Sequence, residues 1–406
     1  AGGCELQDLA YEYGIKESRF PGQQHHYAVS PDDNPFILRD YNKCILCRRC
    51  IRACDEINGV EAIGLIHRGF DSKVGTVFDG TLEDSPCEFC GMCVATCPTG
   101  ALIPKNCVGA GRMWEMKKVT TICPYCGVGC TVDLNVKDNK IVSVSSNWEG
   151  PANKGLTCVK GRFGWDFIQH PDRLTTPLIK KDGQFVPASW DEALDLVADK
   201  FLEIAQKHGP DALAFLSSAK CTNEENYLLQ KMGRALIGTN NIDHCARLCH
   251  SSTVTGLATA FGSGAMTNSI EDVTQEARAF FIIGSNTTET HPVIGMNIRQ
   301  AVKRGAKLIV ADPRKIPLTD FAVLHLQQRP GTDIALLNAL ANVLVTEELY
   351  DKEYVAARTE GFEDLKATLA KYTPEKAEEI TGVPAKDIRE AAHILAANRP
   401  GALLYA

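Results

Sequence analysis

Cysteine is the residue type with the clearest chemical role in this sequence. The chain of 406 residues contains 17 cysteines, and most of them lie in its first third, where they recur at gaps of two and three residues. Thiols this close in sequence are poor disulfide partners, and disulfide scaffolds are usually short secreted chains. Gathered thiolates are instead common metal ligands. The pattern therefore predicts metal-bound thiolates in a reducing compartment, which we expect to be cytoplasmic.

One cysteine motif occurs twice in the segment 39–112. Both copies have the spacing Cys-x2-Cys-x2-Cys-x3-Cys, which is typical of bacterial ferredoxins with two [4Fe–4S] clusters. In that arrangement three close cysteines hold one cluster, and the fourth reaches across to the other. A pair of zinc knuckles is the alternative, although zinc sites usually separate two Cys-x2-Cys units by a longer spacer. The predicted ligands are Cys44, Cys47, Cys50 and Cys97 for the first cluster, and Cys54, Cys87, Cys90 and Cys93 for the second.

A third cysteine set lies in the segment 118–173, where alternating residues such as 131–136 predict strands. A structural zinc site is the alternative to a third [4Fe–4S] cluster at these four thiols. The last of them opens the sequence Cys-Val-Lys-Gly, and the whole set resembles the N-terminal cluster domain of molybdopterin oxidoreductases that bind two pterin guanine dinucleotides. The resemblance implies that Lys160, otherwise a solvated surface lysine, lies between cluster and pterin and helps to relay electrons. The four thiols are Cys123, Cys126, Cys130 and Cys158.

Cys4 stands apart from these sets, in the sequence Gly-Gly-Cys-Glu-Leu-Gln-Asp. This sequence resembles the end of a motif in the large iron–sulfur subunit of respiratory complex I and in related formate dehydrogenases, where one histidine and three cysteines hold a [4Fe–4S] cluster. The resemblance implies that residues 1–38 are the end of such a segment, that Cys4 is one ligand of a partial fourth cluster, and that the chain begins inside the motif. A lone buried thiol is an equally good interpretation. Three further cysteines have no partner at ligand spacing and are expected to be small buried hydrophobic residues: Cys107, Cys221 and Cys245.

The sequence Arg-Leu-Cys-His contains the candidate catalytic residues, Cys249 and His250. Adjacent side chains point to different faces, so the residues alone do not imply a thiolate–imidazole pair, and a buried thiol beside a capping histidine is the alternative. The segment resembles the formate dehydrogenase loop in which a cysteine or selenocysteine binds the metal and a histidine follows. The resemblance implies that Cys249 is a ligand of molybdenum or tungsten, since soft sulfur suits such a metal, and that His250 accepts the proton of formate.

The segment 174–406 has the pattern of an ordinary α/β domain. A capping box at Ser189 predicts the start of an amphipathic helix. An apolar strand at Ala279–Ile283, a helix near 293–304 and a second strand at Lys307–Ala311 form a βαβ unit, which implies a parallel sheet. Residues 402–406 have the composition of a further strand of that sheet, cut off by the end of the sequence. The helix has five apolar residues on one side, at Leu194, Val197, Phe201, Leu202 and Ala205.

Polar loops follow both strands of this βαβ unit. In parallel sheets, ligands bind at the carboxyl ends of the strands and near helix N-termini. Neither loop has the sequence G-x-G-x-x-G, so no nicotinamide site is expected. Each loop alone would be an ordinary turn, but the resemblance implies that together they hold the pterin guanine dinucleotide and that Asp333 contacts the guanine. The predicted cofactor-binding residues, besides Lys160, are Gly284, Ser285, Asn286, Glu289, His291, Asp312, Pro313, Arg314, Gly331, Thr332 and Asp333.

The resemblance spans nearly the whole chain. It implies an α/β fold (α+β overall) that is truncated at both ends. A ferredoxin-like two-cluster domain (39–112) and a small, β-rich cluster domain (118–173) precede a parallel-sheet molybdopterin oxidoreductase domain (174–406). The cofactors implied are three complete [4Fe–4S] clusters, a partial fourth, and molybdenum or tungsten held by bis-molybdopterin guanine dinucleotide. The family's formate-orienting arginine and its C-terminal pterin domain would lie beyond Ala406.

The function that the resemblance implies is interconversion of formate and carbon dioxide. The electrons would pass to a partner, either a flavin- and iron–sulfur-containing subunit linked to NAD(P) or ferredoxin, or a hydrogenase module. A nitrate reductase of the same superfamily is one alternative, against which His250 speaks. A non-catalytic electron conduit like the large complex I subunit is the other, against which Cys249 and Lys160 speak.

The composition argues against several other classes of protein. The formal net charge of -7 leaves no basic stripe for nucleic acid. No run of 18 apolar residues occurs, so no membrane span is expected. The first residues lack the charged start and apolar core of a secretory signal. With 44% hydrophobic and 23% charged residues, the chain has the composition of a globular protein.

Overall fold

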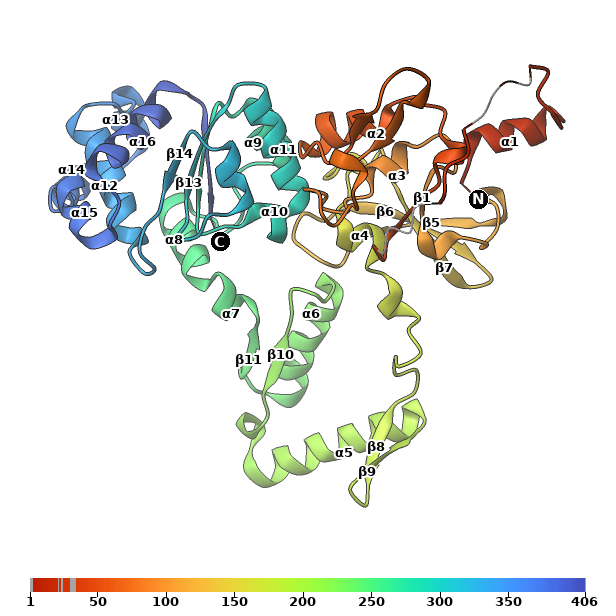
Figure 1. Cartoon of the computed structure of the whole chain (residues 1–406). Coiled ribbons are helices and arrows are strands. Elements are labelled where there is room, and N and C mark those ends of the chain that lie inside the picture. Colours follow the sequence, from red (N-terminus) through yellow and green to blue (C-terminus); the bar gives the residue numbers. More distant parts are fainter. Residues whose placement is uncertain (1–2, 21, 23–24, 30–33, 406) are drawn as a thin grey trace. The chain divides into compact units, whose positions relative to one another are not determined.

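The computed structural model describes residues 3–20, 22, 25–29 and 34–405 (Figure 1). The chain divides into two compact units: residues 1–165 and 268–406 form the first, and residues 166–267 form the second. None of the helices in the described ranges is long and apolar enough to span a membrane. The four-domain division expected from the sequence is finer than these two units and stays a prediction.

The ferredoxin-like part of the first unit is built from very short elements. Strand β1 (Ile37–Arg39) pairs antiparallel with β4 (Leu102–Pro104), and β2 (Gly64–Ile66) pairs antiparallel with β3 (Lys73–Gly75). Each cysteine motif runs into a short helix. The helices are α2 (Arg49–Arg52), which continues as the π-helical turn η2 (Ala53–Asn58), and α3 (Met92–Thr96). Helix α1 (Glu5–Glu12) precedes this part of the chain.

A small antiparallel sheet supports the third cysteine set. It consists of β5 (Lys117–Ile122), β6 (Thr131–Lys137) and β7 (Lys140–Ser146), in that order. Strand β6 is the strand expected at 131–136. The short helix α4 (Val159–Phe163) follows Cys158.

The rest of the first unit is a four-stranded parallel sheet with the order β14-β13-β12-β15. Strand β12 (Ala279–Ile283) lies between β13 (Lys307–Ala311) and β15 (Gly401–Tyr405), and β14 (Leu324–Leu326) is the far edge. All five residues of β12 are buried, as expected for a strand covered on both faces. The βαβ unit predicted from the sequence is therefore confirmed. Strand β15 is an edge of the described sheet, and Ala406, part of the strand expected at 402–406, lies outside the described residues.

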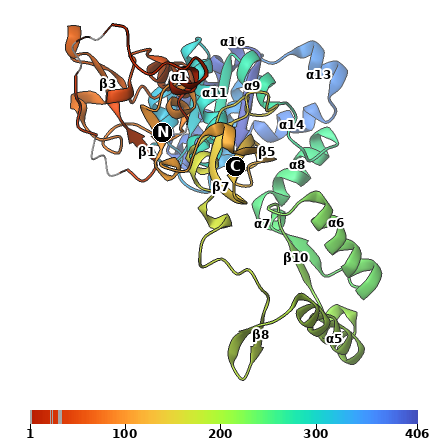
Figure 2. The ribbon, with the colours of Figure 1, turned by 90° about the vertical axis from the view of Figure 1, so that its right-hand side faces the viewer.

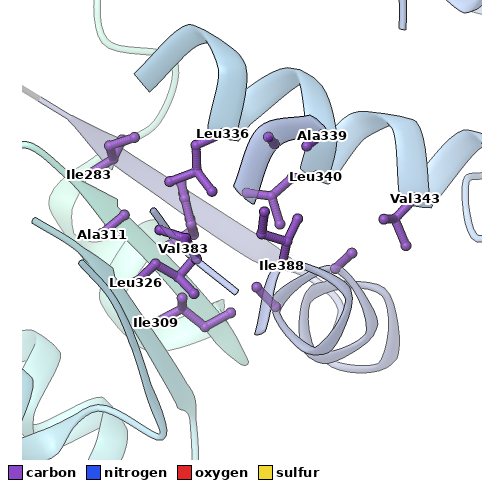
Figure 3. Close-up of a cluster of buried hydrophobic side chains, with 14 residues drawn as sticks. Ile283, Ile309, Ala311, Leu326, Leu336, Ala339, Leu340, Val343, Val383 and Ile388 are labelled. Carbon is purple, nitrogen blue, oxygen red and sulfur yellow. The ribbon is translucent and has the colours of Figure 1, made fainter. Parts of the chain in front are cut away.

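Alternate residues of the sheet face two different helical layers. On one face, Phe281 and Ile309 pack against α12 (Asp333–Thr346) and α16 (Ala385–Ala397), as Figure 3 shows for the labelled residues. On the other face, Phe280 and Leu308 pack against α11. The remaining helices of this unit are α9 (Ile270–Glu276), α10 (Thr287–Thr290), α11 (Pro292–Lys303), α13 (Lys352–Arg358), α14 (Phe362–Leu369) and α15 (Pro374–Thr381).

The second unit is less densely packed (Figures 1 and 2). Its elements are the hairpin β8 (Leu178–Lys181) and β9 (Gln184–Pro187), the parallel pair β10 (Phe215–Ser217) and β11 (Ile242–His244), and the helices α5 (Trp190–His208), α6 (Asn223–Lys231), α7 (Ala246–Cys249) and α8 (Ser251–Phe261). Helix α5 begins where the sequence predicts, because the Ser189 hydroxyl accepts the backbone N–H of Glu192 (3.1 Å). Its apolar side is mostly exposed, although Phe201 contacts Phe215 edge to face.

Candidate metal centres and cofactor loops

The first predicted thiol set gathers around one cavity in the ferredoxin-like part. Cys44, Cys47, Cys50 and Cys97 line it, together with apolar side chains. Burial raises the pKa of Cys50 to about 12, and the nearby Cys97 and Cys44 thiols add to the effect. The structure thus brings the last cysteine of the second motif to the first three of the first motif, which is the crossed arrangement expected from the sequence. Cys47 is exposed, so this cavity lies near the surface.

All four thiols of the second predicted set are half-buried. Burial raises the pKa of Cys93 well above its usual value, and Cys90 and Cys87 act in the same direction. The charge of Cys54, from the other motif, contributes to the raised pKa of Cys90, which is about 12. Backbone and side-chain amides point at these sulfurs: Ala62 N–H donates to Cys54 Sγ (3.2 Å). Such hydrogen bonds are a usual means of tuning an iron–sulfur cluster.

The third set lines a cavity formed by two parts of the first unit. Cys123, Cys126, Cys130 and Cys158 contribute the thiols, and Lys160, Pro292 and Val293 lie in the same wall. Burial raises the pKa of Cys130 to about 12, with the other three thiols as smaller causes. A Cβ at Gly161 would lie 3.4 Å from Cys123 Sγ, so glycine lets α4 approach the thiol closely.

The chemistry of the donors, four thiols around each of three sites, fits [4Fe–4S] clusters. In the described ranges, no group of three or more histidine, cysteine, aspartate or glutamate side chains is arranged to hold a single metal ion. Cluster binding at these sites stays a prediction, and metal analysis distinguishes it from zinc binding.

Lys160 joins the third thiol set to the parallel sheet. Its ammonium group donates to the carbonyl oxygen of Glu289 (3.1 Å). Burial lowers the pKa of His291, and the charge of Lys160 lowers it further. Three predicted site residues, Lys160, Glu289 and His291, therefore lie together beside the cavity of the third set. Lys160 thus contacts both the thiol cavity and the segment that follows β12, and its predicted role in electron relay stays a prediction.

The predicted dinucleotide loops lie at the carboxyl ends of neighbouring strands. Gly284, Ser285 and Asn286 follow β12, and Asp312, Pro313 and Arg314 follow β13. The chain leaves β12 for β13 on one side and returns as β15 on the other, so the β12 loop lies where the strand order reverses. In open parallel sheets this is the usual position of a ligand-binding crevice. Gly284 has φ +61°, a backbone conformation that glycine adopts without strain.

Hydrogen bonds hold two carboxylates of these loops in place. Asp312 accepts the backbone N–H of Arg314 (2.8 Å), and Asp333, the first residue of α12, accepts from the Gln328 amide (3.0 Å). Gly331 and Thr332 precede Asp333 in the turn before this helix. Gln328 is only 2% exposed, and within the described residues its Oε1 has no hydrogen-bond partner. The sequence did not indicate Gln328 as the partner of Asp333, because a single glutamine between a strand and a turn belongs to no motif.

Cys249 and His250 belong to the second unit, whereas the thiol sets and cofactor loops belong to the first. Cys249 is the last residue of α7 and is exposed, and His250 separates α7 from α8. Arg247 forms an ion pair with Asp243 (2.9 Å), which lies four residues earlier in β11. Cys249 is therefore not a buried thiol, and its predicted role as a metal ligand stays a prediction.

The cysteines without an assigned ligand role are less buried than the sequence predicts. Cys107 is half-buried, but Cys221 and Cys245 are exposed, so the expectation that they are buried is wrong. They lie in short loops of the second unit, which has few buried side chains of its own. Cys4 is half-buried and caps α1 by accepting the Gln7 backbone N–H (3.4 Å). The start of α1 contacts the first thiol set, since Leu6 N–H donates to the carbonyl oxygen of Pro98 (3.3 Å).

Three family models match the chain in sequence. Residues 34–103 match the ferredoxin-like domain of NADH-quinone oxidoreductase subunit 3, residues 116–170 match the molybdopterin oxidoreductase Fe4S4 domain, and residues 173–397 match molybdopterin oxidoreductase itself. The last match alone covers more than half of the chain.

Named relatives agree with these matches. The alpha subunit of an F420-dependent formate dehydrogenase from Methanococcus maripaludis is 51% identical over 72% of this chain and 42% of its own length. A probable oxidoreductase of Bacillus subtilis is 38% identical over 97% of this chain and 44% of its own length. This chain thus spans less than half of each relative. Among solved structures, the acetylene hydratase of Pelobacter acetylenicus has a TM-score of 0.64 at 30% identity, covering 71% of this chain and 40% of that one. The chain belongs to the molybdopterin oxidoreductase family.

Proposed function

We propose that this chain is part of a formate dehydrogenase, in which it relays electrons from the site of formate oxidation through three [4Fe–4S] clusters to a partner. The observation that carries the proposal is the position of Lys160. It lines the cavity of the third thiol set and also donates to Glu289 of α10, the short helix that follows the β12 loop. A cluster and a pterin dinucleotide bound at these sites would therefore share one cationic neighbour.

Formate oxidation yields carbon dioxide, one proton and two electrons. When bound, the molybdenum or tungsten pterin centre would supply the two-electron chemistry. Cys249 would be a ligand of that metal, since thiolate suits a soft metal, and His250 would take up the proton. The cofactor-binding loops after β12 and β13 and before α12 would hold the dinucleotide through backbone N–H groups and the carboxylate of Asp333.

Contacts within the first unit support an order for the proposed clusters. Thr157, next to Cys158 of the third set, donates to the carbonyl oxygen of Cys90 in the second set (3.0 Å). The second and first sets are crossed, because the α2–η2 segment carries both Cys50 and Cys54. Electrons would thus pass from the third cluster to the second and then to the first, whose ligand Cys47 is exposed. Cys4, beside the first set, would be a ligand of the cluster that follows.

The electron acceptor is proposed as a separate subunit that carries a flavin and iron–sulfur clusters and reduces NAD(P) or ferredoxin, or as a hydrogenase module. The relative with 51% identity is named F420-dependent, which adds coenzyme F420 to the acceptors to be tested. Relatives named formate dehydrogenase favour formate over nitrate as substrate.

The decisive experiment compares two cysteine substitutions in the enzyme that contains this chain. Cys123→Ser should remove one cluster, so that the enzyme loses about four iron atoms, while formate-driven reduction of the other clusters is lost. Cys107→Ser, at a cysteine without an assigned ligand role, is the control and should keep all clusters. Stoichiometric zinc in place of iron at the third set, or formate-driven cluster reduction in Cys123→Ser, would refute the relay.

A further inference from the structure

Arg162 is a buried cation without a carboxylate partner. It is only 3% exposed, and three neutral oxygens accept its hydrogen bonds. Nη1 donates to the carbonyl oxygen of Val144 (2.9 Å), Nη2 to Ser146 Oγ (2.6 Å), and Nε to Thr157 Oγ1 (3.2 Å). Across the ranges that the structure describes, Arg162 forms no ion pair.

A buried charge of this kind is costly unless an opposite charge lies nearby. Arg299, which is also deeply buried, follows this rule, because it is 1% exposed and both of its terminal nitrogens donate to the carboxylate of Glu88. Burial lowers the pKa of Arg162 to about 10, and negative charge on Cys90 and Cys93 opposes that effect. The negative charge that balances Arg162 is therefore expected from the thiols of the second set and not from a carboxylate.

Packing places Arg162 directly against the loop of the second thiol set. Gly91, between Cys90 and Met92, has φ +72°, and a Cβ there would lie 2.6 Å from Arg162 Cγ. Thr157, which accepts from Arg162, itself donates to the carbonyl oxygen of Cys90 (3.0 Å). On its other side, Arg162 belongs to α4, which starts directly after Cys158 of the third set. The guanidinium thus lies between the second and third sets and against the second.

We propose that Arg162 is the counter-charge of the cluster bound by Cys54, Cys87, Cys90 and Cys93, and that it raises the reduction potential of that cluster. The inference rests on the proposed clusters. A reduced cluster carries one more negative charge than an oxidised one, and a fixed cation in a buried site stabilises the more negative state. Electrons arriving from the third cluster would therefore be drawn to the second.

The test is a redox titration of the clusters followed by EPR, in the anaerobically purified, cluster-loaded protein. Ser146→Asp places a carboxylate at the atom that now accepts from Arg162 Nη2, and Ser146→Asn is its neutral control. We expect Ser146→Asp to lower the ratio of reduced to oxidised second cluster about tenfold at fixed potential, which is about 59 mV for one electron. Arg162→Gln should shift the potential in the same direction, and Arg162→Lys should largely restore it.

Cys93→Ser identifies the signal of the second cluster, because it should remove that signal. If iron and all three signals are present but Ser146→Asp leaves the second potential unchanged, the role of Arg162 is wrong while the clusters stand. An equal shift in Ser146→Asn, or a larger shift at the third cluster, would also overturn it. If Arg162→Gln does not fold, the two Ser146 variants alone test whether Arg162 raises the potential of the second cluster. If the parent protein itself lacks the second cluster, the proposed relay fails instead.

Discussion

The cysteines of the first unit and those of the second differ in burial and in whether other thiols lie close to them. In the first unit, twelve thiols gather in three sets, and most are half-buried or buried. In the second unit, Cys221, Cys245 and Cys249 are exposed and lie on separate loops and helix ends. Short spacing thus brings three thiols of each set together, whereas a single cysteine such as Cys249, in its predicted role as a metal ligand, depends on groups that its neighbours in sequence do not provide.

The largest effect that this comparison predicts is the unfolding of the segment 39–112 when its iron is removed. The segment 39–112 has only two-stranded sheets of three residues and short helices, so the clusters are expected to hold it together. Chelating the iron should unfold this segment and expose its thiols to alkylation, while the cysteines of the second unit react equally before and after. Mass spectrometry of alkylated peptides measures this. Protection of the eight predicted ligand thiols of this segment after complete iron removal would contradict the prediction.

The next largest effect is expected at Cys249. Cys249→Ser replaces a soft sulfur with a hard oxygen ligand, so formate oxidation should be abolished while the EPR signals of the three clusters persist. Cys245→Ser, four residues earlier and also exposed, is the matched control and should oxidise formate normally. Equal activity of the two variants would remove Cys249 from the proposed mechanism.

A smaller loss is expected at the neighbouring histidine. His250→Ala should lower turnover by roughly 10²–10⁴-fold if His250 takes up the proton of formate. A change confined to the Michaelis constant would instead assign the residue to substrate positioning.

The smallest effect is expected from the surface ion pair beside Cys249. Arg247 of α7 and Asp243 of β11 are four residues apart and exposed to solvent, and an ion pair of this kind contributes little to stability because water screens it. Arg247→Gln should therefore change the free energy of unfolding by less than the error of most denaturant titrations. A larger loss of stability, or a loss of activity comparable with that of His250→Ala, would show that the α7 segment is held by more than its own contacts.

The elements that the sequence predicts correctly are those determined by local patterns. The crossed thiol sets follow from spacing, and the βαβ unit follows from two apolar runs separated by a helix. The start of α5 follows from its capping serine, but the burial of its apolar side does not, because exposure depends on what packs against the helix. Leu194 and Leu202 illustrate this, since both are exposed despite their helical spacing.

Contacts between distant segments could not be predicted. Arg299 of α11 donates to Glu88, 211 residues earlier, and to Asn58, whose amide in turn points at Cys90 Sγ (3.6 Å). Lys303 forms ion pairs with Asp55 (2.5 Å) and Glu61 (2.6 Å). These contacts join the parallel sheet to the ferredoxin-like part. Nothing in the sequence around Arg299 or Lys303 indicates such partners.

The position of β12 has a consequence for how the protein is synthesised. One edge of β12 pairs with β13, which leaves the ribosome soon afterwards, but the other edge pairs with β15, from Ala279 opposite Gly401 onward. Until that distant segment is made, the uncharged strand Ala-Phe-Phe-Ile-Ile presents an unpaired edge, which is a common template for aggregation. The nascent chain is therefore expected to need protection by a chaperone during this interval, and slow translation beyond β13 should lower the yield of folded protein.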